Sequence, residues 1–186
     1  SKTIHLDFMD SGIFTAGSIG FVSSALTCIS LVHRFKIPEV SSLFKQAIKS
    51  RKQNLGNRIF ILGNLHTYPI AMYAAAKFYE VLGLDAHYER IEQFSHMGLF
   101  SAKPGDTVII FEEKNQYNAK LVENLKNVGL EVIRPDSKSK DKISQILFYC
   151  FVAQLMPLFE AKRKNLKECY FVTSKKIRNA SSAMIY

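Results

Sequence analysis

The sequence predicts an α/β protein whose mostly parallel sheet is covered by helices on both faces. Short apolar segments typical of buried strands alternate with longer segments of helical periodicity. Strands that are apolar throughout belong inside such a sheet, because an antiparallel sheet with one wet face gives alternating polarity. The chain has 186 residues, of which 47% are hydrophobic, so it is long enough for one domain with a sizeable core and too short for two ordinary domains.

Two helices are expected before the sheet begins. Residues 13–32 form the most apolar stretch, and their number approaches that of a membrane span. Six of these twenty residues are Ser or Thr and two are Gly, a mixture that favours a helix packed tightly inside a soluble fold over membrane insertion. A second helix follows, with Pro38 at its start and Glu39 in its first turn.

The alternation of strands and helices occupies residues 56–160 and defines an α/β/α core. Residues 1–55 precede it as leading helices or a connector, and residues 161–186 follow it as a tail, so that 1–186 form a single domain. Glycines and Pro-Gly or Asp turns separate the elements. The expected order is strand 58–62, helix 67–82, strand 85–89, a short helix or irregular segment at 91–100, strand 107–111, helix 118–129, strand 130–135 and a long helix over 141–164.

Charge and cysteine usage restrict the possible partners. The net charge is +9, with basic runs at 49–52, 138–142 and 162–167, so an anionic ligand is favoured. These basic residues do not alternate with aromatic residues in any nucleic-acid motif, which makes nucleic acid an unlikely partner. The three cysteines have no metal-ligand spacing, and this predicts reduced thiols in a cytoplasmic protein.

The turn after the first strand is the first candidate site. Ligands bind beyond the carboxyl ends of parallel strands, and the N–H groups of a following helix attract phosphate. The turn carries a hydroxyl and is followed by Pro69, which suits a first helical turn. An ordinary structural turn is the alternative. The candidate substrate-binding residues of this turn are Gly63, Asn64, His66, Thr67 and Tyr68.

Three further side chains could carry acid–base chemistry. Lys77 and Glu80 are three residues apart on one predicted helix, so they form either a surface ion pair or a positioned carboxylate base. His96 lies in a short segment between two strands and is either a proton-transfer group or a loop histidine without a role. The sequence contains no pair of histidines or carboxylates at metal-ligand spacing, so no metal site is predicted.

Taken together, "GNLHTYPIAMYAAAKFYE" and the later "IEQFSHMG" resemble the sugar isomerase (SIS) domain family. The resemblance is closest to the second of the two SIS domains in glucosamine-6-phosphate synthase and in proteins of the phosphoglucose isomerase type. It rests on the glycine turn with Tyr-Pro-Ile-Ala, on Lys-x-x-Glu, and on a histidine 16 residues after Glu80. It covers most of the chain, best from Arg58 to Phe159.

The resemblance implies a three-layer α/β/α sandwich with a flavodoxin-like sheet that binds a hexose 6-phosphate. Glu80 becomes the base that moves a proton between C1 and C2 through an enediol, and Lys77 positions it. His96 becomes the ring-opening residue, which in this family often reaches the site of a neighbouring subunit. Near the carboxyl terminus, Lys176 is the catalytic candidate and Lys175 a substrate-binding one. This chemistry needs no cofactor, and the expected partner is a second SIS domain or a second copy of the chain.

The sequence also departs from the family pattern. Asn64 replaces a common arginine, Gln93 replaces a glutamate, and Met97 interrupts the His-Gly-Pro turn. The serine-rich phosphate loop of the first SIS half has no counterpart here, so either the chain is the second half of a longer double-SIS protein or its phosphate is held differently. The alternatives to an isomerase are a non-catalytic sugar-phosphate regulator, a structural half-domain and, from charge alone, a nucleic-acid binder.

Overall fold

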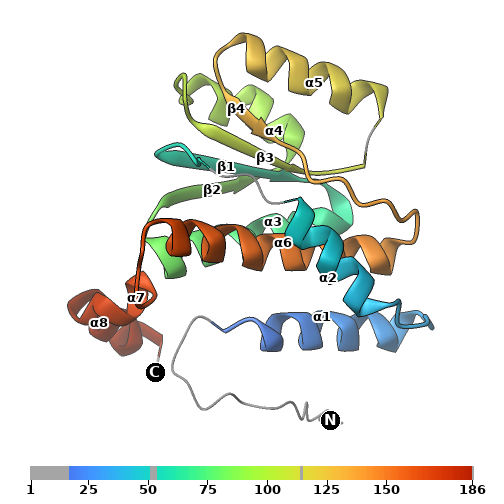
Figure 1. Cartoon of the computed structure of the whole chain (residues 1–186), viewed down its shortest axis with the longest axis horizontal. Helices are drawn as coiled ribbons and strands as arrows, with labels where there is room; N and C mark the ends of the chain where they lie inside the picture. Colours follow the sequence, from blue (N-terminus) through green and yellow to red (C-terminus); the bar gives the residue numbers. More distant parts are fainter. Residues whose placement is uncertain (1–16, 51–53, 114, 186) are drawn as a thin grey trace.

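Three layers make up the fold, with a sheet between two sets of helices (Figure 1). The computed structural model describes residues 17–50, 54–113 and 115–185. Helices α3 and α6 cover one face of the sheet, and α4 and α5 cover the other. The predicted α/β class and the three-layer α/β/α architecture are therefore confirmed.

The sheet has four parallel strands in the order β2-β1-β3-β4. Their bounds are β1 Arg58–Gly63, β2 Asp85–Glu89, β3 Thr107–Phe111 and β4 Glu131–Ile133. In the register, Ile59 pairs with Ala86 on one side and with Thr107 on the other. Because the chain adds β2 on one side of β1 and β3 on the other, the strand order reverses at β1, where doubly wound folds open a crevice.

Strand residues alternate between two apolar cores. The core shared with α3 (Tyr68–Leu82), α6 (Lys142–Arg163) and α2 (Val40–Lys49) contains Ile59, Ile61, Ile109 and Phe111. The core shared with α4 (Ile91–His96) and α5 (Gln116–Asn127) contains Phe60, Leu62, Val108 and Ile110. Both faces of each central strand are thus buried, which is why these strands read as continuous apolar runs.

Helix α6 is the long terminal helix that the sequence predicts. By length and composition it could cross a membrane, and it is the one such helix among the described residues. Most of its apolar surface is nevertheless buried inside the fold. Its start is fixed by Asp141, whose carboxylate accepts hydrogen bonds from the backbone N–H and the hydroxyl of Ser144, both at 2.8 Å. It is therefore a core helix of the sandwich.

Helix α1 (Ile19–Val32) forms an outer layer below α3 and α6 (Figure 1). The expected helix over 13–32 is described only from residue 17 onward. Its inner face packs on the core, and the ring of Phe21 stacks on that of Tyr73 at 4.0 Å between centroids. The expectation of a helix packed tightly inside the fold needs correction, because no residue of α1 is buried within this chain and Leu31 and Val32 are 64% and 87% exposed.

The C-terminal tail contains two helices, α7 (Tyr170–Thr173) and α8 (Lys175–Ile185). It returns to the end of α3, where Gly83 terminates that helix with φ 64° and donates its N–H to the carbonyl of Tyr79. The aromatic ring of Tyr170 lies against Gly83 so closely that a Cβ there would come within 2.7 Å of the ring. Gly83 therefore ends α3 and, because it has no side chain, leaves room for Tyr170 of the tail to pack there.

Candidate functional site

The residues predicted to bind substrate and those predicted to act on it lie at opposite ends of α3. The turn from Gly63 to Thr67 leads into the helix, whereas Lys77 and Glu80 lie in its last turns. At a rise of about 1.5 Å per residue, Tyr68 and Glu80 are separated by roughly 18 Å along the helix axis. One chain therefore does not bring the two groups together.

The turn is held by local hydrogen bonds that explain its sequence. The hydroxyl of Thr67 accepts a hydrogen bond from the N–H of Asn64 at 2.9 Å, and the N–H of Thr67 donates to the carbonyl of Asn64 at 2.9 Å. A Cβ on Gly63 would come within 2.7 Å of the carbonyl oxygen of Thr67. Glycine is therefore needed for the chain to fold back so closely.

The carboxylate of Glu112 occupies the anion position of this turn. Its Oε1 accepts a hydrogen bond from the N–H of Asn64 at 2.8 Å and lies 2.9 Å from the hydroxyl of Thr67. Glu112 follows β3, so the contact joins two strand ends at the crevice of the sheet. A phosphate expected at this turn would meet a carboxylate of the protein already bound to the same donors.

Removing that carboxylate should open the turn to anions. We expect Glu112→Ala to lower the free energy of unfolding by about 1–3 kcal/mol, because the N–H of Asn64 loses its charged partner. In the variant, inorganic phosphate should shift the amide resonances of Asn64 and Thr67, whereas in the wild-type chain it should not. Glu123→Ala, an exposed substitution on α5 with the same change of charge, is the control. Equal phosphate shifts in the wild-type chain would contradict this account of the turn.

A cavity of about 500 Å³ lies beside the turn at the carboxyl edge of the sheet. Asn64 and Tyr68 line it together with Arg90, Glu92 and Tyr117. The guanidinium of Arg90 lies 5.4 Å from the centre of the Tyr68 ring, and the side chain of Asn64 accepts a hydrogen bond from the N–H of Ile91 at 3.3 Å. Two of the five turn residues thus reach this cavity.

The remaining turn residues lie elsewhere. Gly63 and Thr67 are buried behind the turn. His66 is half-buried, and within the described part of the chain its Nε2 has no hydrogen-bond partner. It contributes to lowering the pKa of Glu113, although the main causes there are hydrogen bonds from Lys142 and Gln145. His66 is not among the residues that line the neighbouring cavity.

At the other end of α3, Lys77 and Glu80 form a pair that differs from a surface ion pair. The side chain of Lys77 is only 7% exposed, and its ammonium donates to the carboxylate of Glu80 and to the carbonyl of Gly17, the latter at 2.5 Å. The Glu80 side chain is 39% exposed. A buried cation thus holds a carboxylate that remains partly accessible to solvent.

Tyr73 forms the wall behind this pair. The Lys77 ammonium lies 5.2 Å from the centre of its ring. Burial raises the pKa of Tyr73 to about 12, and the hydrogen bond that its hydroxyl receives from Gln154 at 3.1 Å partly offsets the effect. The hydroxyl consequently stays protonated at physiological pH and adds no negative charge beside Glu80.

Glu80 opens onto a cavity of about 540 Å³ between the end of α3 and the C-terminal helices. Its walls include aromatic side chains of α3 and α7 and a polar face of α8. The residues with polar side chains there, besides Glu80 and the tyrosines, are Ser174, Arg178, Ser181 and Ser182. Sequence analysis missed these four, although their spacing in the tail follows one helix face.

The lysines expected near the carboxyl terminus are close in sequence to this cavity but do not line it. Lys175 and Lys176 are exposed and form the first turn of α8. Their neighbours Ser174 and Arg178 line the wall instead. The tail therefore approaches Glu80, as the resemblance implies, through different side chains.

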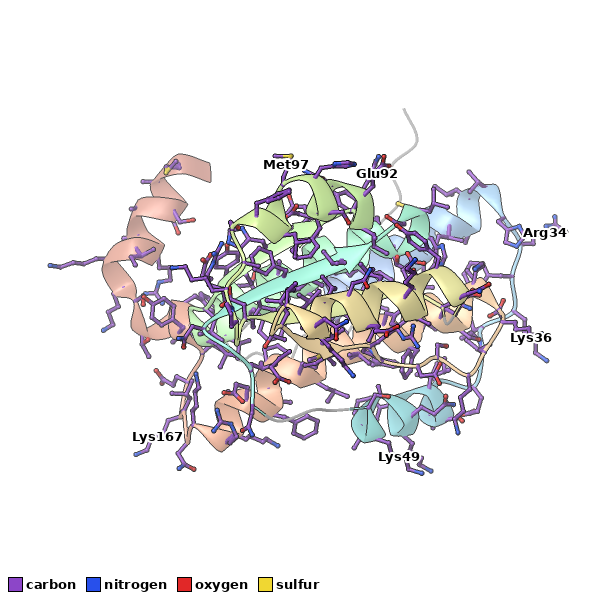
Figure 2. The ribbon with its side chains drawn as sticks, turned by 90° about the horizontal axis from the view of Figure 1, so that it is seen from above. Arg34, Lys36, Lys49, Glu92, Met97 and Lys167 are labelled. Atoms are coloured by element: carbon purple, nitrogen blue, oxygen red, sulfur yellow. The ribbon has the colours of Figure 1, made fainter. Side chains whose placement is uncertain are left out.

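His96 lies far from Glu80 within one chain. It is exposed and ends α4, on the opposite face of the sheet from α3. Figure 2 shows that Met97 and Glu92, from the same segment, reach the outer surface of the molecule. The segment is held by Gly98, where any side chain would collide with the carboxylate of Glu89.

The last residue of β2, Glu89, lies next to this segment and has a shifted pKa. Burial raises the pKa of Glu89, while His87 and a hydrogen bond from the backbone of Gly98 act in the opposite direction. Nothing comparable to a metal centre accompanies it, since no group of three or more His, Cys, Asp or Glu side chains among the described residues could hold a metal ion.

Comparison with known proteins shows the fold without showing a family. No protein-family model and no curated protein matches the chain. Among solved structures, glucosamine-6-phosphate deaminase from Thermotoga maritima superposes with a TM-score of 0.65 at 16% identity, over 79% of this chain and 51% of that one. The C-terminal domain of glucosamine-fructose-6-phosphate aminotransferase from Francisella tularensis gives 0.50 at 14% identity, over 81% and 45%.

Tagatose-6-phosphate ketose/aldose isomerase from Escherichia coli is a further structural neighbour. Its TM-score is 0.50 at 17% identity, and the match covers 77% of this chain and 42% of that one. The chain thus spans about half the length of the enzymes it superposes on. The shared feature is the parallel α/β sandwich of phosphosugar enzymes.

Proposed function

We propose that this chain is a sugar-phosphate-binding SIS domain that takes part in the aldose–ketose isomerisation of a hexose phosphate. The observation that carries the proposal is the accessible carboxylate of Glu80, held by the buried Lys77 at the mouth of a cavity of about 540 Å³. The fold shared with enzymes of phosphorylated sugars supports the substrate class.

The proposed chemistry follows from a single carboxylate base. Glu80 takes the proton from C2 of the open-chain aldose, the C–H electrons form the C1–C2 double bond of an enediol, and the C1 carbonyl oxygen takes a proton from water. Glu80 then returns its proton to C1, the enediol electrons form the new C1–H bond, and the C2 hydroxyl releases its proton to water as it becomes the ketone. Lys77 orients the carboxylate and can donate to a sugar oxygen. Neither step requires a cofactor.

The proposed site is completed by a second domain or a second copy of the chain. The outer face of α1 exposes apolar side chains, and such a surface favours burial against a partner. His96 is exposed at the far end of the molecule, where it can serve a neighbouring subunit. Cysteine usage supports a cytoplasmic location, and burial raises the pKa of the Cys150 thiol to about 12, so it is unreactive.

A sugar-phosphate regulator without catalysis is the second candidate. The specific observation that favours it is that the sequence lacks the family's serine-rich phosphate loop. The regulator and the isomerase would bind the same class of ligand, and they differ in whether Glu80 moves a proton.

Titration of the chain with glucose 6-phosphate tests where the ligand binds. We expect amide shifts at residues 79–83 and 170–182, which surround the Glu80 cavity, because the ligand orders both walls. Unphosphorylated glucose is the control for the sugar ring alone. Shifts confined to the basic run 138–142 would indicate unspecific anion binding, and shifts centred on Asn64 and Arg90 would place the ligand in the other cavity. Either result would contradict the proposed site.

A further inference from the structure

The wall that α8 contributes to the Glu80 cavity has a composition unlike the rest of the cavity. The segment from Ser174 onward lines it with Ser174, Ile177, Arg178, Ser181 and Ser182, and the aromatic side chains of the lining are Tyr79 of α3 and Tyr170 and Phe171 of α7. Among the described residues that line the cavity, Glu80 is the one carboxylate. The cavity lining thus offers hydroxyls, a guanidinium and aromatic surface.

The polar residues of α8 form one face of a single helix. Arg178 follows Ser174 by four residues, and its N–H donates to the carbonyl of Ser174 at 3.0 Å, so the helical ladder extends back to that serine. Ser181 and Ser182 come three and four residues after Arg178. Side chains at these spacings lie above one another on one helix face. The apolar side chain of Ile177 lies on the same face and also lines the cavity, whereas Lys175, Lys176 and Asn179 do not line it.

The beginning of α8 carries charge of the unfavourable sign. The N-terminus of a helix has a partial positive charge that acidic residues normally offset. In α8 the first turn holds no acidic residue and contains Lys175 and Lys176. The ammonium groups of these two lysines have the same sign as the helix N-terminus, so a bound anion at this end of α8 is electrostatically favoured.

The docking of the tail fixes this face toward Glu80. Tyr170 packs on Gly83, the residue that ends α3 three positions after Glu80. Helix α7 is therefore held at the end of α3, and α8 continues from it (Figure 1). The polar face of α8 and the carboxylate of Glu80 consequently share one cavity of about 540 Å³, within the range of small-ligand sites.

We infer that Arg178 and the serines of α8 bind the phosphate group of the ligand whose carbon chain reaches Glu80. The inference rests on the proposed function and extends it by naming the phosphate subsite. A guanidinium binds phosphate in a planar, two-pronged manner, and serine hydroxyls add neutral donors. The aromatic side chains, Tyr79 and Tyr170 in particular, provide the apolar surface for the carbon skeleton. In this subsite the tail supplies the phosphate-binding donors that a serine-rich loop would otherwise provide.

Binding of glucose 6-phosphate, glucose and inorganic phosphate to the 186-residue chain tests the subsite. We expect Arg178→Ala to weaken glucose 6-phosphate binding about 10- to 100-fold, the usual cost of losing a hydrogen-bonded charge. The weak binding of unphosphorylated glucose should be unchanged. Arg178→Lys should recover part of the lost affinity, because lysine keeps the positive charge but lacks the paired N–H donors of the guanidinium. Arg34→Ala, which removes the same charge at the end of the molecule opposite α8 (Figure 2), should have no effect.

A second substitution and a folding measurement guard against a structural explanation. The double variant Ser181→Ala with Ser182→Ala removes two exposed hydroxyls. It should also weaken the binding of glucose 6-phosphate more than the binding of glucose. Each variant should keep the thermal unfolding midpoint of the wild-type chain.

Three results would overturn the subsite. The first is that Arg178→Ala binds glucose 6-phosphate with wild-type affinity. The second is that this variant loses affinity equally for glucose and glucose 6-phosphate. The third is that the wild-type chain does not bind glucose 6-phosphate. The proposed isomerase function is judged separately, by turnover in the complete assembly, so it can stand when the subsite fails.

Discussion

Replacing Glu80 with Gln will lower the isomerisation rate about 10²–10⁴-fold, the usual contribution of a general base, and leave hexose-phosphate binding nearly intact. The substitution keeps the shape of the side chain and an oxygen that can accept from Lys77, which remains bonded to the carbonyl of Gly17. The measurement is exchange of the C2 hydrogen with solvent deuterium, because this step needs the base alone. Exchange should disappear in the variant at substrate concentrations that saturate both proteins.

The assay must contain the complete assembly, with a second SIS domain if the protein requires one. Glu123→Gln, an exposed carboxylate on α5, is the matched control and should leave the rate unchanged. Full exchange in Glu80→Gln would show that the carboxylate is only the partner of Lys77. If no common hexose phosphate is isomerised by the complete assembly, the regulator becomes the better explanation.

Mixing two inactive variants will restore activity if His96 serves the site of a neighbouring copy. Within one chain, Glu80 ends α3 on one face of the sheet and His96 ends α4 on the other. His96→Asn should be slow on the cyclic sugar and less so on an open-chain analogue. In an equal mixture of Glu80→Gln and His96→Asn dimers that exchange subunits, about a quarter of the sites contain both native residues.

The mixture should therefore recover about a quarter of the wild-type rate, far above the rate of either variant alone. A control mixture of Glu80→Gln with a Glu80→Gln, His96→Asn double variant contains no native site and should stay inactive. Subunit exchange is checked by mass spectrometry of differently labelled chains. Recovery that fails despite exchange would rule out a shared site and would leave His96 as a surface residue of α4.

The fold could be predicted because its signals are local. The strands 85–89 and 107–111 match the structure at both ends, and the helix expected over 67–82 begins one residue later. The central strands 58–63 and 107–111 are buried on both faces and bounded by turn residues, which makes their ends visible in the sequence. The strand expected over 130–135 is shorter, Glu131–Ile133, because Pro135 cannot donate to a neighbouring strand.

The arrangement of the site could be predicted only in part. Sequence periodicity places Lys77 and Glu80 together because their contact is local. The contact of Glu112 with Asn64 joins residues 48 positions apart, and no pattern within either segment encodes it. The position of Arg178 depends in the same way on the docking of Tyr170 against Gly83. Such contacts are decided by the packing of whole elements, which spacing along the chain does not reveal.

Helix α3 also has a mechanical consequence. Its first residue, Tyr68, lines the cavity at the sheet edge, and Glu80 lines the cavity beside α8. A helix of this length is stiff along its axis, and a face of buried alanines and Phe78 packs it into the core that it shares with the sheet and α6. The two cavities consequently share one stiff helix as part of their walls. A slide or tilt of α3 displaces one wall of both, so neither pocket can widen through this helix without reshaping the other.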